Sequence, residues 1–128
     1  MIVVDTSAAV ALILEEAGGD TLAAKLATSP QRVLSPVSYS ELIMVLSRTF
    51  SQPKVVADEF MRDMRITFLA IDEVHAQLAV RAFLLFGKGR HPARLNLGDC
   101  FSYAAAMALD APLLFVGGDF NKTDIKIA

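Results

Sequence analysis

The chain opens with Met1-Ile2-Val3-Val4-Asp5-Thr6-Ser7-Ala8, an apolar run that ends at a carboxylate followed by two hydroxyl side chains. The run predicts a short buried strand, and Asp5-Thr6-Ser7 offers side-chain caps for a helix that continues to about Glu16. A carboxylate beside a buried strand costs free energy unless a positive charge pairs with it. This segment therefore predicts the first strand and helix of the fold and a first candidate for a functional side chain.

Three further acids lie beside apolar stretches in the same manner. Glu41 and Asp99 each open a long apolar run, and Asp119 follows one. Four carboxylates that converge would repel one another and raise each other's pKa values, and a bound divalent cation would remove that repulsion. Carboxylate oxygens are hard ligands that suit Mg²⁺ or Mn²⁺. We therefore predict a metal-dependent phosphodiesterase site in which Asp5, Glu41, Asp99 and Asp119 are catalytic and in which Asp5 and Asp99 hold the metal ion.

Strand-like and helix-like segments alternate along the chain. Short strands are expected at 1–4, 33–34, 66–71, 113–116 and, as an edge strand, 123–127. Helices are expected over 6–16, 20–27, 35–50, 53–65, 73–86 and 97–109. The alternation predicts an α/β fold, a three-layer α/β/α sandwich with a mainly parallel central sheet, as a single domain over 1–128. Ligands of such folds bind beyond the carboxyl ends of the strands, where two of the acids are expected.

Composition and charge narrow the classes of function. The hydrophobic fraction of 54% exceeds the usual share of about 45–50% and predicts an apolar surface that a protein partner covers. A formal charge of −2 argues against a protein that binds nucleic acid over its whole surface. Cys100 is the only cysteine, which excludes an intrachain disulfide and a thiolate zinc site. No signal peptide or membrane-spanning apolar run is visible, so we expect a soluble, cytoplasmic protein with no membrane partner.

Each acid also has a purely structural interpretation. Asp5 could simply cap the helix that follows it. Ser38-Tyr39-Ser40-Glu41 fits the capping-box pattern, in which Glu41 would only close the first turn of a helix. Asn96 and Asp99 fit the same pattern, and a helix N-terminus favours a negative charge. The last acid, after two glycines, could be an ordinary turn residue. The shared location expected for the four acids favours the functional interpretation.

Several segments, spread over essentially the whole chain, match the motifs of one protein family. They are 1–8, Glu41, Phe86-Gly87-Lys88-Gly89-Arg90-His91-Pro92-Ala93, Leu95-Asn96-Leu97-Gly98-Asp99-Cys100-Phe101-Ser102-Tyr103-Ala104, 113–115, 119–120 and 123–125. Through them the chain resembles the PIN-domain family, and within it the VapC-type ribonuclease toxins of bacterial toxin–antitoxin pairs. The resemblance places Asp5, Glu41 and Asp99 at the acidic positions of the family's motifs. Asp119 stands alone in a segment where relatives commonly carry a second charged residue, and this chain has Gly118 there.

The resemblance implies a PIN-like fold and Mg²⁺-dependent endoribonuclease activity, with Mn²⁺ as a substitute. It also implies a homodimer and inhibition by a small cognate antitoxin. For that antitoxin we expect an apolar helix or strand in a groove between the helices at 36–50 and 54–65, with a basic side chain near the carboxylates.

A basic loop at 87–94 precedes the helix expected at 97–109. It could be a flexible connection with no further role. In the functional interpretation its cations lie near the acidic site, where the backbone of single-stranded or looped RNA could rest. The predicted RNA-contacting residues are Thr6, Ser7, Lys88, Arg90 and Arg94.

Two other functions remain open from the sequence. One is a catalytically silent PIN-fold module that only binds RNA or protein, and the presence of all four carboxylates argues against it. The other is a receiver-type phosphoacceptor domain, which has a similar length and alternation. A receiver would carry an acidic pair after the first strand, whereas Asp5 stands alone there.

Overall fold

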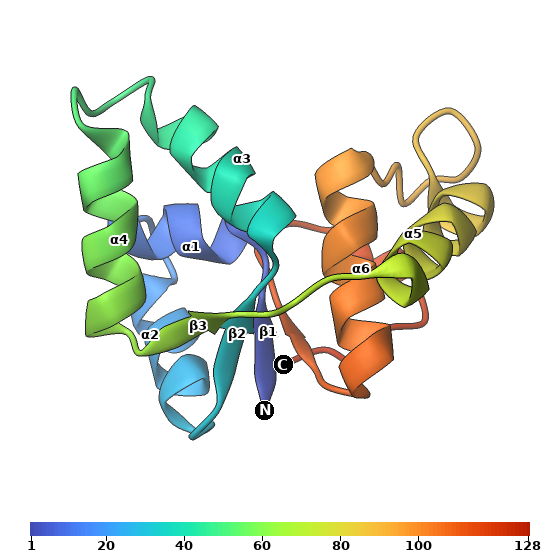
Figure 1. Cartoon of the computed structure of the whole chain (residues 1–128), viewed down its shortest axis with the longest axis horizontal. Coiled ribbons are helices and arrows are strands. Elements are labelled where there is room, and N and C mark those ends of the chain that lie inside the picture. Colours follow the sequence, from blue (N-terminus) through green and yellow to red (C-terminus); the bar gives the residue numbers. More distant parts are fainter.

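The computed structural model describes residues 1–128 as a four-stranded sheet covered by helices (Figure 1). The strands are β1 (Ile2–Val4), β2 (Arg32–Leu34), β3 (Ile66–Phe68) and β4 (Leu113–Leu114). The helices are α1 (Thr6–Ile13), α2 (Gly19–Ala27), α3 (Pro36–Leu46), α4 (Pro53–Asp63), α5 (Glu73–Phe86) and α6 (Leu97–Leu109), and a 3₁₀ turn, η1 (Phe120–Lys122), follows β4. The strands lie in the order β3-β2-β1-β4 and all neighbouring pairs are parallel. No helix is both long enough and apolar enough to cross a bilayer.

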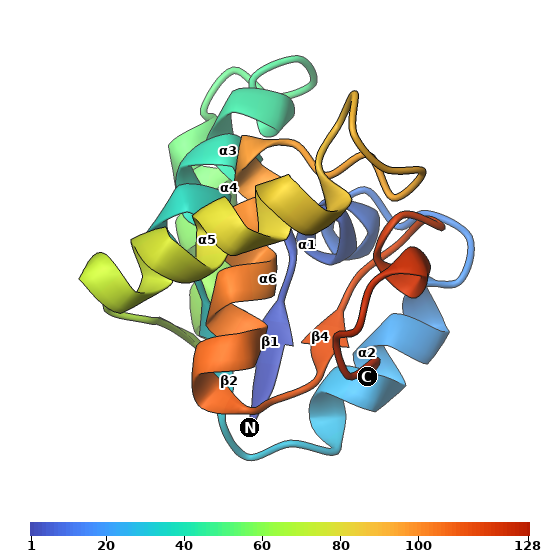
Figure 2. The same cartoon turned by 90° about the vertical axis from the view of Figure 1, so that its right-hand side faces the viewer.

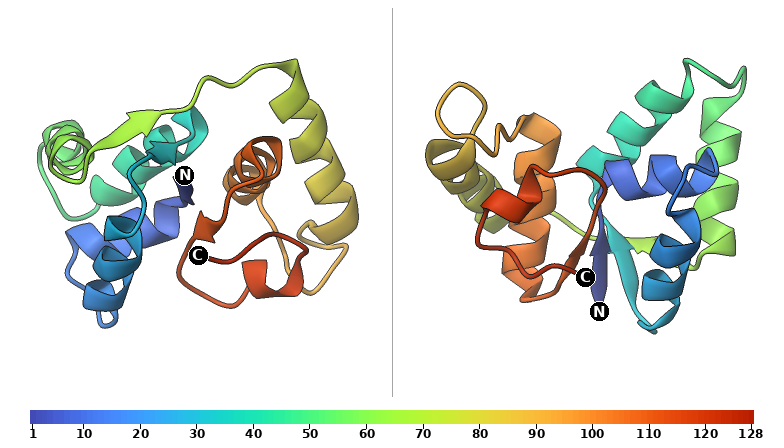
Figure 3. Two further views of the ribbon diagram at one scale, coloured as in Figure 1. Left: turned by 90° about the horizontal axis from the view of Figure 1, so that it is seen from below. Right: turned by 180° about the vertical axis from the view of Figure 1, so that it is seen from behind.

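The sheet is apolar on both faces, and each face packs on its own hydrophobic core. Val3 of β1 points with Val33 and Leu113 into a core shared with α5 and α6. Its neighbours Ile2 and Val4 point the other way, into a core shared with α1, α2, α3 and α4. Successive strand residues face opposite sides, so an unbroken apolar strand requires a layer of helices on each side. Figure 3 shows these layers and confirms the predicted three-layer α/β/α sandwich.

The arrangement of the helices brings several chain segments to one end of the sheet. β1, β2 and β4 run upward in Figure 1, so their carboxyl ends point to the region where α1, α3 and α6 meet. Helix α6 packs directly on β1 and β4, and α5 covers the outer side of α6 (Figure 2). The first turns of α1 and α6 and the middle of α3 therefore lie beyond the strand ends.

Several elements are shorter than the sequence predicts. The helices expected to end near 16, 50 and 65 end at Ile13, Leu46 and Asp63. Phe50 still packs on the core from the turn after α3. Its apolar side chain therefore indicated that the residue is buried, and did not indicate that it is helical. The prediction of a strand over 123–127 is wrong, because only Ile127 pairs there, in an isolated parallel bridge with Leu113.

The start of α3 corrects one interpretation of Glu41. The cap of α3 is Ser35, whose hydroxyl accepts a hydrogen bond from a backbone N–H two residues on. Ser38 lies inside the helix, fully buried, with its hydroxyl 3.1 Å from that of Ser102 on α6. The capping-box interpretation of residues 38–41 is therefore wrong, and the Glu41 carboxylate has no capping role at this helix start.

Candidate active site

A cleft of about 330 Å³ lies beyond the carboxyl end of β1, between α1, α3 and the start of α6. Three of the four predicted acids line it, namely Asp5, Glu41 and Asp99, whereas Asp119 does not. The other lining residues are Thr6, Ser7, Val10, Glu16, Val45, Asn96 and Val116. Acids that are far apart in the sequence thus come together because a strand end, a helix middle and a helix start converge.

Asp5 is buried, with 3% of its surface exposed, and hydrogen bonds hold both of its carboxylate oxygens. Its Oδ2 accepts from the backbone N–H of Ser7 at 2.9 Å and from the Ser7 hydroxyl at 2.6 Å. Its Oδ1 accepts from the hydroxyl of Ser102 at 2.6 Å. Asp5 is therefore the N-cap of α1, which confirms its structural interpretation. The hydrogen bond from Ser102 of α6 holds it as well, and a residue that only caps α1 would not need this bond.

Glu41 rests against the first turn of α6, where Gly98 leaves room for its carboxylate. A Cβ atom at position 98 would lie 2.5 Å from Glu41 Oε2 and 2.8 Å from Oε1. Any larger residue at this position would push the Glu41 side chain away. The backbone N–H groups of a helix start carry partial positive charge, which favours a carboxylate here.

Asp99 occupies the third position of α6 and completes a capping box with Asn96. Its Oδ2 accepts from the Asn96 backbone N–H at 3.0 Å, and the Asn96 side chain accepts from the Asp99 N–H at 2.9 Å. Burial raises the pKa of Asp99 to about 6, the Asn96 bond opposes the rise, and the charges of Asp5, Glu41 and Asp119 add to it. The structural interpretation of Asp99 is thus correct, and its raised pKa comes mainly from burial, with smaller contributions from the three neighbouring acids.

Asp119 and Glu16 lie at the margins of the cleft. Asp119 is exposed at the start of η1 and makes no capping hydrogen bond, yet its charge contributes to the raised pKa of Asp99. Glu16 lines the cleft although sequence reasoning placed it in a helix and gave it no role. It reaches the cleft because α1 ends early, where Glu15 adopts a left-handed backbone with φ of 53°. The sequence feature that could have identified Glu16 is that it is an acid close to the end of the first helix.

The donor atoms suit a divalent cation, but a complete metal cage is not formed. No group of three or more Asp, Glu, His or Cys side chains is arranged to hold a metal ion. Mg²⁺ usually keeps several waters and binds proteins through one or two carboxylates, so it does not require such a cage. Asp5 and Asp99 fit a water-rich ion of this kind, because both are carboxylates in a cleft whose charge is unbalanced.

The hydroxyls of Thr6 and Ser7 are engaged inside the protein. Thr6 donates to the backbone carbonyl of Ser38 at 3.2 Å, which ties the start of α1 to α3. The Ser7 hydroxyl donates to Asp5 and accepts from the Val116 N–H at 3.0 Å. Both residues therefore organise the cleft, and a direct contact of either with RNA stays a prediction.

The basic side chains Lys88, Arg90 and Arg94 are exposed in the loop between α5 and α6, and none of them lines the cleft. Arg90 turns back onto α5, where its guanidinium lies 5.8 Å from the ring centroid of Phe83 and Nε donates to the Leu84 carbonyl at 3.4 Å. The loop is anchored at its ends by a bridge between residues 87 and 95. Its contact with RNA stays a prediction.

Comparisons of sequence identify the family of the chain. The PIN domain model matches residues 2–126. Ribonuclease VapC42 of Mycobacterium tuberculosis is 41% identical over 129 residues, with 98% of each chain covered. Ribonuclease VapC of Mycolicibacterium smegmatis is 40% identical over 124 residues, with 96% of each chain covered.

Solved structures share the fold. VapC20 of Mycobacterium tuberculosis, a toxin described as cleaving the Sarcin-Ricin loop, has a TM-score of 0.78 at 19% identity and covers 100% of this chain and 98% of its own. VapBC-1 from nontypeable Haemophilus influenzae has a TM-score of 0.73 at 21% identity, with 100% of this chain and 97% of that chain covered. The resemblance predicted from the sequence is confirmed, and the chain belongs to the PIN-domain family.

Proposed function

We propose that this chain is a metal-dependent endoribonuclease that acts on cytoplasmic RNA as the toxin of a toxin–antitoxin pair. The observation that carries the proposal is the convergence of Asp5, Glu41 and Asp99 in one cleft at the strand ends. Full-length relatives at about 40% identity bear the name ribonuclease, which supports the same reaction class. The one serine that lines the cleft, Ser7, is engaged in holding Asp5, and a cleft of carboxylates of this kind suits hydrolysis by an activated water.

In this proposal Asp5 and Asp99 bind Mg²⁺, for which Mn²⁺ substitutes, and Glu41 and Asp119 act through intervening waters. When bound, the ion supplies a Lewis acid that lowers the pKa of a coordinated water and neutralises charge on the phosphate. The chain's own residues do the rest of the work. Asp5 is held immobile by Ser7, and Glu41 borders the cleft opposite it and can orient a water by hydrogen bonding.

The substrate proposed is single-stranded or looped RNA, whose backbone can bend into a small cleft. Lys88 and Arg94 are free to approach the flanking phosphates from the loop before α6, because neither makes an ion pair in the structure. Arg90 is partly committed to the ring of Phe83, so we expect it to contribute less.

Cleavage of a labelled RNA with and without EDTA tests the function directly. Wild type should cut in Mg²⁺ or Mn²⁺ and not in EDTA, and Asp5→Asn and Asp99→Asn should each be inactive. Asp110→Asn, a change of the same chemistry at the exposed C-terminal end of α6, is the matched control and should remain active. RNA binding without cleavage in either metal would instead identify a silent binding module.

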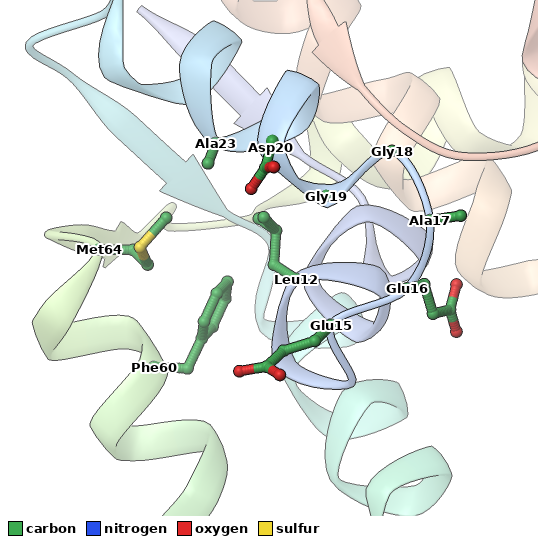
Figure 4. A pocket seen from close by; sticks show the side chains of 10 residues that line it. All are labelled: Leu12, Glu15, Glu16, Ala17, Gly18, Gly19, Asp20, Ala23, Phe60 and Met64. Carbon is green, nitrogen blue, oxygen red and sulfur yellow. The ribbon is translucent and has the colours of Figure 1, made fainter.

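The antitoxin site proposed is a groove of about 580 Å³ between α1, α2 and α4 (Figure 4). Phe60 of α4 and Met64, which directly follows α4, face Leu12 of α1, and Glu15 and Asp20 point into the same space. The sequence analysis placed the antitoxin segment between the helices at 36–50 and 54–65, and we propose instead the groove that α4 forms with α1 and α2. An apolar antitoxin segment with a basic side chain fits these walls, and complexes of related fold are titled as toxin–antitoxin assemblies.

The groove also leads toward the cleft. Glu16, on the turn after α1, lines both this groove and the active-site cleft. Phe60→Asp should therefore abolish capture of a small partner from the native host and leave RNA cleavage intact. Val55→Asp, on the exposed side of the same helix, is the control and should change neither. Equal capture by the Phe60 variant would reject the groove as the antitoxin site.

The homodimer surface proposed is the apolar hollow of about 490 Å³ between α5 and α6. Its lining residues are all apolar: Ala76, Ala79, Val80, Phe83, Leu97, Cys100 and Phe101. Leu97 is 73% exposed and Val80 is 56% exposed, which is costly for side chains that water alone covers. A second copy of the chain would cover them beside the mouth of the active site, since Leu97 adjoins Asn96.

A further inference from the structure

We propose that Ser102, itself held by Ser38, is a positioning residue that makes Asp5 a one-oxygen ligand of the metal ion. This inference rests on the metal-dependent function proposed above and concerns how the chain presents its first acid. Neither serine was a candidate in the sequence, and neither lines the cleft. Both are buried behind it, with 0% and 1% of the surfaces of Ser38 and Ser102 exposed.

Asp5 Oδ2 is fully engaged in hydrogen bonds. A carboxylate oxygen has two lone pairs in the plane of the group. Both lone pairs of Oδ2 are occupied, by the N–H and the hydroxyl of Ser7. The Ser7 hydroxyl cannot easily turn away, because the N–H of Val116 donates to it from beyond β4. Oδ2 therefore has no lone pair left for a metal ion.

The hydrogen bonds that reach Asp5 Oδ1 have a defined direction. A serine hydroxyl has one proton, and Ser102 donates it to Asp5 Oδ1 at 2.6 Å because an ionised carboxylate can only accept. In the 3.1 Å contact between Ser38 and Ser102, the proton must then come from Ser38. The order of donation is Ser38 to Ser102 to Asp5, and it leaves Oδ1 with one free lone pair.

The Ser102 hydroxyl does not bond within its own helix. A serine inside a helix commonly donates to the carbonyl four residues earlier. Here the hydroxyl instead crosses to a residue 97 positions earlier in the sequence. Residues 103–106, which follow it in α6, all belong to the hydrophobic core, so Ser102 is a polar side chain at the edge of an apolar layer. The hydroxyl serves Asp5.

A single presented oxygen fits a cation that keeps most of its water. Mg²⁺ in such sites binds through one or two carboxylates and retains several waters. Groups that hydrogen-bond a metal ligand and fix its orientation typically contribute 10–100-fold to metal affinity. Ser102 has this position relative to Asp5, and Ser38 supports it from behind.

Calorimetric titration of the purified, EDTA-treated protein with Mn²⁺ tests the inference without any cleavage assay. Ser102→Ala should bind Mn²⁺ roughly 10–100-fold more weakly than wild type. Ser38→Ala removes a hydroxyl whose one hydrogen-bond partner is Ser102, so it should lose less, and Ser102→Thr, which keeps the hydroxyl, should retain most of the affinity. Ser29→Ala removes another buried serine hydroxyl, bonded to the carbonyl of Gln31 far from the cleft, and should bind as wild type does.

The outcomes separate the two proposals. If wild type binds Mn²⁺ and both Ser102→Ala and Ser38→Ala bind it equally well, Ser102 has no positioning role and only this inference fails. If wild type binds no Mn²⁺, the metal-dependent function fails with it. If Ser102→Ala does not fold, as circular dichroism would reveal, Ser38→Ala decides: unchanged affinity rejects the inference and a measurable loss supports it.

Discussion

Replacing Asp99 by asparagine should stabilise the metal-free protein at neutral pH. The pKa of Asp99 is about 6, against an ordinary value of 3.8, a difference of about 2 pH units. At 1.36 kcal/mol per pH unit this corresponds to at most about 3 kcal/mol. Since the carboxylate is only partly buried and water screens its charge, we expect about 1–2 kcal/mol. Asparagine retains an oxygen that can accept the capping bond from Asn96, so the helix start should survive.

The pH dependence has a defined sign. The folded protein holds the Asp99 proton more tightly than the unfolded chain, so folding is favoured by protonation and loses stability as pH rises from about 4 to about 6. The Asp99→Asn variant does not lose stability over this pH range, because it lacks the titrating carboxyl group. Its advantage over wild type should be absent at pH 4 and complete at pH 7.5. Saturating Mg²⁺ should make wild type more stable than the variant. A ligand at 100 times its dissociation constant adds about 2.7 kcal/mol to the free energy of unfolding of the protein that binds it.

Urea unfolding at pH 4 and pH 7.5, in EDTA and in Mg²⁺, measures these quantities. Asp110→Asn is again the matched control, since its exposed carboxylate pairs only with Lys126 and should change stability by less than about 0.5 kcal/mol at either pH. A less stable Asp99→Asn variant at pH 7.5 in EDTA would refute the electrostatic account. A stabilisation of equal size at both pH values would refute it as well.

Three further changes have distinct expected outcomes. Asp119→Asn should weaken Mn²⁺ affinity roughly 10–100-fold with activity restored by excess Mn²⁺; a variant as inactive as Asp5→Asn at saturating metal would show direct ligation. Gly98→Ala should keep or raise stability, by up to about 1 kcal/mol from helix propensity, yet reduce cleavage because the new Cβ displaces the Glu41 carboxylate; unchanged cleavage rates would show that this close contact is not needed. Val80→Glu should convert a dimer to a monomer in analytical ultracentrifugation, and a wild-type monomer at micromolar concentration would already exclude the dimer.

The fold followed from the sequence because its strands are apolar on both sides and are separated by helical segments. The helix ends were less predictable. Apolar residues such as Phe50 are buried from turns, and a pattern of apolar spacing does not distinguish a turn from a last helical turn. The early end of α1 depends on the left-handed backbone conformation of Glu15. The sequence does not predict this conformation, because it is uncommon for residues other than glycine.

The acids of the site could be predicted singly, but the groups that support them could not. Asp5 and Asp99 stand where local patterns place an acid at a strand end and at a helix start. Ser102 resembles any serine within a helix until the chain folds and brings it against Asp5. Gly98 likewise looks like part of a helix start, and its lack of a side chain matters only once Glu41 lies over it.

The division of the interior into two hydrophobic cores has a practical consequence for obtaining conditional mutants. Glu41 belongs to a helix packed on one core, and Asp99 to a helix packed on the other. A cavity in either core would loosen one acid relative to its counterpart while every carboxylate remains present. Temperature-sensitive forms of the enzyme should therefore be recoverable from either layer, at buried positions such as Leu46 or Leu95 that do not line the cleft. Such alleles would permit growth at high temperature and regain toxicity on cooling.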